Sequence, residues 1–234
     1  MLSLMKALLT FVAALAFGAS ALAVQGFRGF RPDQFPIPQI DPPVQPAGYA
    51  FAIWGVIYLW LILGAGFGVV LRPVEDDWDE MRLPLIGSLG IGAFWIPVAN
   101  VSPFWATVMI WAMLALAVMA LLKAGRDDPW WQRAPIGLYA GWLTAAACVA
   151  TGLLLAGHGL LGAQTAALVA IGLALAVGLG VLLLRHDIPT YALALAWALV
   201  GVMVSNLAPL NLVVLATCAV GLAILALQIL ATRR

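Results

Sequence analysis

The chain has 234 residues, of which 65% are hydrophobic and 9% are charged. A soluble domain is about 45–50% apolar and about 25% charged, so this composition excludes a water-soluble fold and makes the bilayer the solvent. The net charge of +1 provides no basic surface for a nucleic acid partner.

Eight apolar runs approach the length of about 20 residues that a membrane-spanning helix needs. Because these runs are rich in Ala, Leu and Gly and show no strand-like alternation, we predict an all-α polytopic membrane protein. The third run is short and contains Pro97, and the seventh is marginal in length, so either could be a tilted, broken or partial span. The runs cover residues 3–24, 48–71, 84–100, 103–123, 135–157, 161–184, 190–207 and 210–231.

The first run has two interpretations. Lys6, the apolar segment 7–17 and the small residues 21–23 have the order of a secretory signal peptide. The same run is also long enough to be a retained spanning helix. We favour the retained helix, because the family resemblance described below requires it.

The loop at about 25–47 is long, aromatic and rich in proline. It could be a solvated tether, but Phe27, Phe30 and Phe35 would then be exposed, so we expect it to pack over the helix ends. Its last part contains three prolines, which stiffen the chain and lack a backbone N–H. These prolines, which form a candidate lid, are Pro42, Pro43 and Pro46.

The second run begins directly after this lid and carries Trp54 and Tyr58. Residues four apart lie on one face of a helix. A rigid lid that leads into an aromatic face favours a site for a flat apolar ligand.

Two acidic loops contain tryptophans. Trp78 lies in PVEDDWDEMR, and Trp130 and Trp131 lie in AGRDDPWWQR. The simpler interpretation is an interfacial belt of tryptophans at the membrane surface. The alternative is an acidic contact surface for a partner protein.

The centres of the predicted spans contain no Lys, Arg, Asp or Glu, which argues against proton relays, ion pumps and retinal-type photoreceptors. His158 and His186 fall in loops on opposite sides of the membrane, and no residue set has zinc-ligand spacing. We therefore predict no catalytic residues and no metal site; a role for His158 as an axial haem ligand is a weaker alternative. Cys148 and Cys218 lie within spans, where thiols act as small apolar groups.

The distribution of charge predicts the orientation. If the N-terminus is cytoplasmic and all eight runs span, nine Lys and Arg residues lie inside and only Arg28 and Arg31 outside. The short loops after residue 100 make consecutive helices antiparallel neighbours. Three pairs of small residues four apart predict close helix packing, namely Gly64–Gly68, Ser88–Gly92 and Ala174–Gly178.

Two segments and one further tryptophan resemble a known family. Residues 42–58 read PPVQPAGYAFAIWGVIY and residues 134–150 read APIGLYAGWLTAAACVA. The first resembles the loop and second helix of tryptophan-rich sensory proteins, the TspO/MBR family, which are relatives of the mitochondrial translocator protein. In the second, Pro135, Tyr139, Trp142 and Ala146 look like the fifth helix of that family, and Trp95 resembles its third-helix tryptophan.

The resemblance implies a five-helix bundle over 1–157, followed by three additional transmembrane helices over 158–234, as in a long, divergent branch of the family. It also implies a pocket beneath the lid. Family members bind porphyrins, some bind cholesterol, and many are dimers, so a homodimer is an expectation. The ligand-binding residues it implies are Trp54, Tyr58, Trp95, Tyr139, Trp142 and Ala146, with Pro42, Pro43 and Pro46 as the lid.

Three positions depart from the family pattern. The phenylalanine expected before Trp54 is displaced by one residue to Phe51, and asparagines expected in helices three and five are replaced by Gly92 and Ala150. The pocket therefore has fewer polar groups than the family pattern, which leaves the identity of the ligand open.

These observations predict an integral membrane protein of the bacterial inner membrane, with both termini cytoplasmic, that binds or senses a flat hydrophobic ligand. The ligand classes are a porphyrin, haem included, or a sterol-like molecule, and no other cofactor is expected. The alternative is a small carrier of hydrophobic molecules, in which the three last helices complete a pathway. A porphyrin-degrading enzyme is less favoured, since the sequence offers no acid–base constellation for it.

Overall fold

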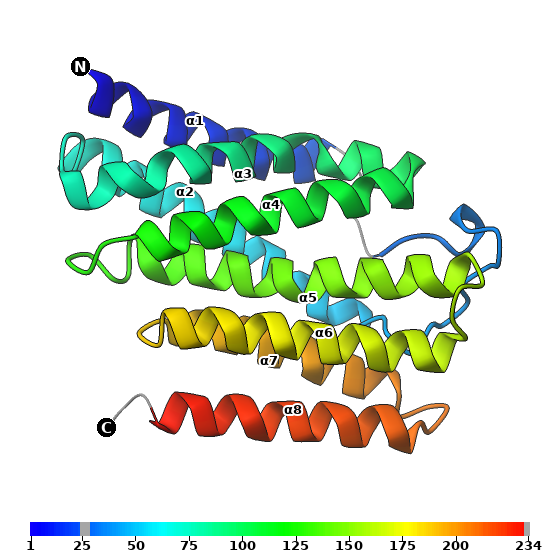
Figure 1. Ribbon diagram of the computed structural model, residues 1–234. Helices are drawn as coiled ribbons and strands as arrows, with labels where there is room; N and C mark the ends of the chain where they lie inside the picture. Colours follow the sequence, from blue (N-terminus) through cyan, green and yellow to red (C-terminus); the bar gives the residue numbers. More distant parts are fainter. Residues whose placement is uncertain (24–28, 232–234) are drawn as a thin grey trace.

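The computed structural model describes residues 1–23 and 29–231, and its regular elements are helical (Figure 1). Among the described residues, seven helices are long and apolar enough to span a membrane, and the eighth, α7, is apolar but has only 17 residues. The predicted all-α polytopic fold is confirmed. The elements are α1 (Leu2–Ala23), η1 (Pro32–Gln34), η2 (Gly48–Ala52), α2 (Ile53–Leu71), α3 (Asp76–Val101), α4 (Pro103–Lys123), α5 (Arg133–Gly157), α6 (Ala163–Leu184), α7 (Pro189–Ser205) and α8 (Leu212–Ala231).

Helix α5 is shared by two groups of helices. On one side α1, α2, α5, α4 and α3 contact one another in that order and close a five-helix ring. On the other side α6 and α7 both contact α5 and α8. The start of α1 lies at one end of the bundle, and the loop between α1 and α2 covers the other, which we call the lid end (Figure 1).

The approach of α5 to α7 depends on two glycines one turn apart. A Cβ atom at Gly141 would lie 2.3 Å from the carbonyl oxygen of Tyr191, and one at Gly137 would lie 2.6 Å from Oγ1 of Thr190. Small residues at this spacing let the backbones of two membrane helices come close. Among the pairs expected from the sequence, Gly68 and Gly92 also pack tightly, but against the rings of Trp78 and Phe17 respectively.

Helix α3 is longer than the expected 84–100. It has 26 residues, begins at Asp76 and continues through both Pro84 and Pro97. Three aspartates in its first turn favour this earlier start, because carboxylates stabilise the positive end of a helix dipole. Residues 76–83, which we expected to lie in a loop, therefore form the first two turns of α3.

Trp78 corrects the belt interpretation. Its side chain is only 2% exposed, and its Nε1 donates a hydrogen bond to Asp128 at 2.9 Å. Trp78 therefore packs inside the bundle, whereas Trp130 and Trp131 are exposed as expected. The carboxylates that the sequence grouped into an acidic surface include Asp128, which is also paired with Arg72.

A buried arginine joins the first three helices at the end opposite the lid. Arg82 of α3 is 1% exposed and donates to the carbonyl oxygens of Arg72 and Pro73, at 2.5 and 3.0 Å, just beyond the end of α2. It also pairs with Asp79, which in turn pairs with Lys6 of α1 at 2.5 Å. These contacts satisfy carbonyls that the end of a helix leaves unpaired.

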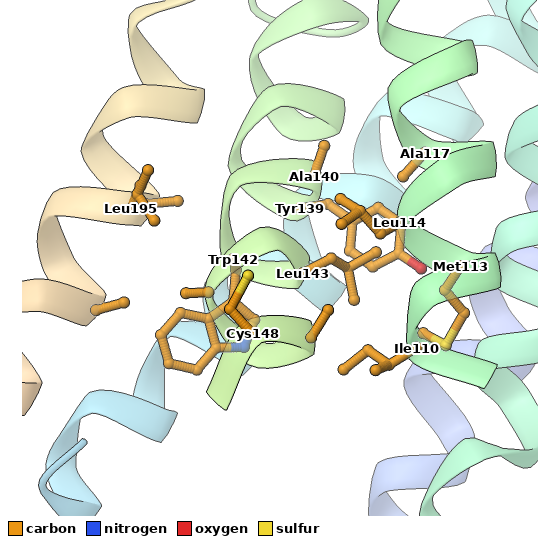
Figure 2. Close-up of a cluster of buried hydrophobic side chains, with 14 of the residues drawn as sticks. Ile110, Met113, Leu114, Ala117, Tyr139, Ala140, Trp142, Leu143, Cys148 and Leu195 are labelled. Carbon is orange, nitrogen blue, oxygen red and sulfur yellow. The ribbon is translucent and has the colours of Figure 1, made fainter. Parts of the chain in front are cut away.

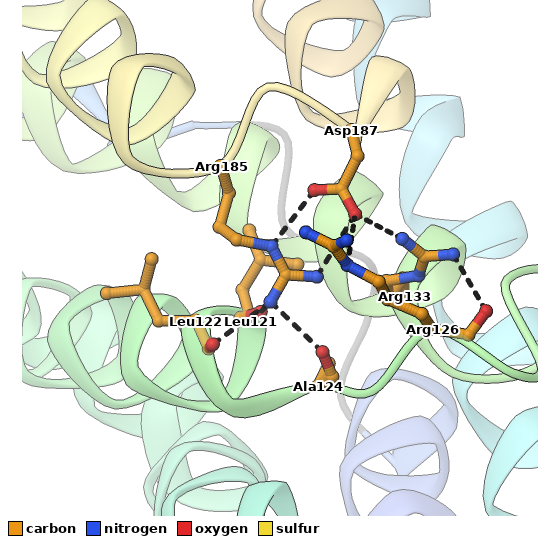
Figure 3. A network of polar contacts seen from close by, with 7 residues as sticks. All are labelled: Leu121, Leu122, Ala124, Arg126, Arg133, Arg185 and Asp187. Atoms are coloured by element: carbon orange, nitrogen blue, oxygen red, sulfur yellow. Dashed lines mark hydrogen bonds and ion pairs between the residues drawn. The ribbon is translucent and has the colours of Figure 1, made fainter. Parts of the chain in front are cut away.

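A second polar network ties the two helix groups together at the same end (Figure 3). Arg185, which follows α6, donates to three carbonyl oxygens at the end of α4. Asp187 accepts hydrogen bonds from Arg185, at 2.9 Å, and from Arg133 of α5, and it lies 3.8 Å from Arg126. Burial raises the pKa of Asp187, but the Arg185 hydrogen bond and the charges of Arg185 and Arg133 outweigh it, so the pKa lies below its usual value.

Replacing Gly141 by alanine should weaken the contact between α5 and α7, because the added Cβ overlaps the Tyr191 backbone. Overpacking of this kind costs about 1–3 kcal/mol. The measurement is the thermal unfolding midpoint in detergent. Gly180→Ala in α6 is the control, since nothing lies within 4 Å of its Cβ position. Equal midpoints for the two variants would contradict the contact.

Asp187→Asn should destabilise the protein at neutral pH. A carboxyl whose pKa is lowered by folding stabilises the fold above its unfolded value of about 3.9, and this contribution is lost as the pH falls through the native pKa. The difference in unfolding midpoint between the wild type and Asp187→Asn should therefore shrink below about pH 4. Asp33→Asn, on an exposed surface, is the control, and a pH-independent difference for Asp187→Asn would contradict this assignment.

Candidate functional site

The loop between α1 and α2 packs over the helix ends, as expected. Phe30 and Phe35 are buried with their rings 6.0 Å apart, which confirms that they pack against the protein, while Phe27 lies outside the described residues. The loop is also fixed by hydrogen bonds, from the Ile37 N–H to the Gly157 oxygen at 2.9 Å and from Gln34 to the backbone of α3. This first part of the loop, which precedes the candidate lid, is thus packed against the helix ends.

Two adjoining cavities lie within the five-helix ring beneath this loop. They share Phe51, Trp95 and Ile110 as a common wall. The upper cavity, of about 40 Å³, is lined by Gly29, Phe30, Gln45, Pro46, Phe51, Trp95, Ile110, Trp142, Ala145, Ala146, Val149, Ala150 and Leu153. The lower cavity, of about 140 Å³, is lined by Phe17, Ala21, Phe51, Trp54, Tyr58, Trp95, Ile96, Ile110 and Met113.

Five of the six predicted binding residues line these cavities. Trp54 and Tyr58 face the lower one, Trp142 and Ala146 face the upper one, and Trp95 lines both. The two helices that the sequence singled out therefore meet at one place. The rings of Trp54 and Tyr58 are stacked at 5.4 Å, and Trp54 meets Trp142 edge-on at 6.1 Å.

The sixth residue, Tyr139, lines neither cavity. It points from α5 toward α4 (Figure 2), and its hydroxyl lies 2.9 Å from Ser88 Oγ, which donates to the carbonyl oxygen of Met113. This chain of hydrogen bonds joins three helices. Tyr139 thus supports the wall behind the cavity.

Of the three lid prolines, only Pro46 lines a cavity. Pro42 is buried and Pro43 is half-buried, but neither faces the cavity space. Gln45 lies between these prolines and contributes the polar side chain of the upper cavity.

Phe17 of α1 is a central residue of the site that sequence reasoning missed. Its ring contacts those of Tyr58, Tyr139 and Trp54, with centroids 4.9, 5.5 and 5.9 Å away. It packs against rings from both α2 and α5 and lines the lower cavity. A signal for it exists in the sequence, because Phe17 is the one large ring within the small-residue segment AALAFGASALA.

The indole of Trp142 is unusual because its Nε1 is buried and has no hydrogen-bond acceptor within the described part of the chain. Five other tryptophans do have acceptors: Trp60, Trp78, Trp95, Trp111 and Trp197. A buried donor without a partner costs about 1–3 kcal/mol. In Figure 2 this nitrogen is on the side of the ring that faces Ile110, which also lines the upper cavity.

The cavities are small for a ligand. Pockets for drug-sized molecules have volumes of about 300–1,000 Å³, well above those of the two cavities. A flat ligand must therefore displace the lid or aromatic side chains such as Phe17 and Phe51.

Residues with catalytic or metal-binding chemistry lie elsewhere. His158 is exposed at the lid end of α5 and lines neither cavity. Cys148 and Cys218 are buried free thiols. In residues 1–23 and 29–231, no group of three His, Cys, Asp or Glu could hold a metal ion.

One known protein family matches most of the chain. The family described as TSPO-like protein matches residues 7–231. The match includes α6, α7 and α8, whereas the motifs recognised in the sequence extend only to residue 157; the division into units 1–157 and 158–234 stays a prediction. No curated protein and no solved structure matches the chain. Because the family match covers nearly all of its length, the chain belongs to the TSPO-like protein family.

Proposed function

We propose that this membrane protein binds a flat, aromatic ligand with a hydrogen-bond acceptor, in the space formed by the two cavities. The observation that carries the proposal is the Nε1 of Trp142, which has no acceptor among the described residues and lies in an aromatic site where Gln45 is the other polar residue of the upper wall. An acceptor atom on the ligand would satisfy this donor. The rings of Trp54, Tyr58 and Trp95 provide faces and edges on which a planar ligand stacks.

A porphyrin is the ligand class that fits these features best. It is planar, apolar over most of its surface, and carries carboxylates and ring nitrogens that accept hydrogen bonds. A sterol stacks less well on indole rings, because it has no aromatic face. The protein then acts as a receptor or sensor, and none of the residues in the site is assigned a catalytic role.

The distribution of charge supports an orientation in the bacterial inner membrane with both termini cytoplasmic. The two arginine networks at the end opposite the lid contain Arg82, Arg126, Arg133 and Arg185, and a cytoplasmic position for them agrees with the positive-inside rule. Arg28, Arg233 and Arg234, which also contribute to the charge count, lie outside the described residues. In this orientation the lid faces the periplasm.

Replacing Trp142 by phenylalanine tests the site. This change retains a ring and removes the N–H. Because a ligand acceptor would remove the cost of about 1–3 kcal/mol of the buried unpaired donor, the change should weaken protoporphyrin binding by about five- to 150-fold. The measurement is quenching of tryptophan fluorescence by protoporphyrin in detergent. Trp105→Phe is the matched control, because Trp105 is 61% exposed and lines neither cavity.

Two results would count against the assignment. One is equal affinity for the wild type, Trp142→Phe and Trp105→Phe. The other is unchanged affinity when Trp54 and Trp142 are each replaced by alanine. Either result would place the ligand elsewhere in the molecule.

A second candidate function is a carrier for the same ligand class, and a further cavity favours it. This cavity, of about 20 Å³, lies in the same ring and is lined by Thr10, Arg82 and Gln132 among others. The Oε1 atom of Gln132 is buried there, and no donor among the described residues reaches it. The cavity at Gln132 and the aromatic site at Trp142 lie in the same five-helix ring, and a carried molecule could bind at both in turn.

Flux measurements distinguish a carrier from a receptor. A carrier should move protoporphyrin across proteoliposome membranes with saturable kinetics, and Gln132→Leu should slow the flux without changing the affinity of the Trp142 site. A receptor should bind protoporphyrin with no flux above that of protein-free vesicles. Saturable flux that Gln132→Leu leaves unchanged would exclude the path through this cavity.

A further inference from the structure

We infer that the end of α7 is a latch that holds the lid closed over the aromatic site, so that the C-terminal helices control access to it. This inference rests on the proposed function, because it assigns a regulation to the same site. Here the lid denotes residues 42–47, and the latch denotes Gly201, Ser205 and Asn206.

Three hydrogen bonds join the latch to the lid. Nδ2 of Asn206 donates to the carbonyl oxygen of Pro43 at 2.8 Å, and Oγ of Ser205 donates to that of Gln45 at 2.7 Å. In the other direction, the N–H of Ala47 donates to the carbonyl oxygen of Gly201 at 2.9 Å.

Helix α7 also forms a hydrogen bond with η2, the segment between the lid and α2. Nε1 of Trp197 on α7 donates to the carbonyl oxygen of Ala50 in η2 at 2.9 Å. The ring of Trp197 also meets that of Tyr49 edge-on at 5.5 Å. Helix α7 therefore supports the chain from the lid to the start of α2.

The lid depends on outside donors because of its proline content. Pro42, Pro43 and Pro46 have no backbone N–H, so half of the six lid residues cannot donate to neighbouring carbonyls. Within the lid, Gln45 N–H bonds to the Pro42 oxygen. The oxygens of Pro43 and Gln45 instead accept hydrogen bonds from Asn206, which directly follows α7, and from Ser205, its last residue.

The residues that the latch holds are also those that line the cavity. Gln45 and Pro46 form part of the upper cavity wall. A Cβ atom on Gly201 would lie 3.0 Å from Cβ of Pro46 and 2.8 Å from Cβ of Ala50, so the helix and the lid are in direct contact. Any shift of the lid away from α7 changes the shape of the binding space.

The latch can release without leaving its own side chains unpaired. Ser205 Oγ and Asn206 Nδ2 both also lie within hydrogen-bond distance of the Val202 carbonyl oxygen, at 2.9 and 2.8 Å. When the lid moves away, both groups keep this partner in their own helix. Opening therefore costs little at α7, as a reversible latch requires.

The double variant Ser205→Ala with Asn206→Ala removes the two side-chain donors of the latch. The matched control is Thr217→Ala with Gln164→Ala, which also removes one hydroxyl and one amide but takes them from α8 and α6. The Thr217 hydroxyl donates to Val213 of its own helix, and Gln164 pairs with Asn211. Both proteins are studied full-length in detergent. Gly201→Ala is a second latch variant, which displaces the lid sterically instead of removing donors.

The first measurement is hydrogen exchange of the Gln45 and Ala47 amides, which needs no ligand. Loss of two hydrogen bonds should accelerate their exchange by about tenfold in the latch variant, compared with the wild type and the control. The second measurement is stopped-flow mixing with protoporphyrin. Association and dissociation rates should rise together by about tenfold, with a smaller change in affinity.

Each outcome bears on the latch. Faster exchange together with faster association and dissociation supports it. Unchanged exchange in both latch variants overturns it, as does faster exchange with unchanged ligand rates. If the wild type binds no protoporphyrin, the proposed function fails, and the exchange rates alone then decide whether α7 holds the lid.

Discussion

The close contact of α5 with α7 is the constraint on which the rest of the structure depends. Helix α5 needs residues without a Cβ atom at Gly137 and Gly141, because α7 packs directly against its backbone there. On its other sides the same helix carries Tyr139 and Trp142, which support and line the aromatic site. Helix α5 thus has small residues on the face toward α7 and large aromatic rings on the face toward the five-helix ring. Because it has both faces, it belongs to both helix groups.

This contact determines where the C-terminal half of α7 can lie. With its first half against the glycines of α5, the helix runs alongside η2 and ends where the lid passes. The backbone oxygen of Gly201 and the side chain of Ser205 then face the lid and bond to it. The C-terminal helices, to which the motifs alone assign no role, therefore contact the lid through the end of α7.

The sequence predicts features that depend on composition and helical spacing. The eight helices and the shared face of Trp54 and Tyr58 follow from local patterns, whereas the expectation that those residues share a pocket with Trp142 comes from the family resemblance. Sequence reasoning missed features that depend on distant partners. Trp78 has the local surroundings of an interfacial residue, but its burial depends on Asp128, fifty residues later in the chain. The hydrogen bonds between the lid and the latch all have backbone oxygens as acceptors, and no sequence pattern identifies such acceptors.

The polar groups of the site favour a closed state when a ligand is bound. In the structure the latch side chains are satisfied, while the Nε1 of Trp142 has no acceptor among residues 1–23 and 29–231. A ligand that supplies the acceptor removes that cost of about 1–3 kcal/mol, and it does so only while it stays within the cavity. Since Gln45 and Pro46 enclose the same cavity from the lid side, the ligand gains most when the lid is closed. Binding at Trp142 and latching at α7 therefore stabilise each other.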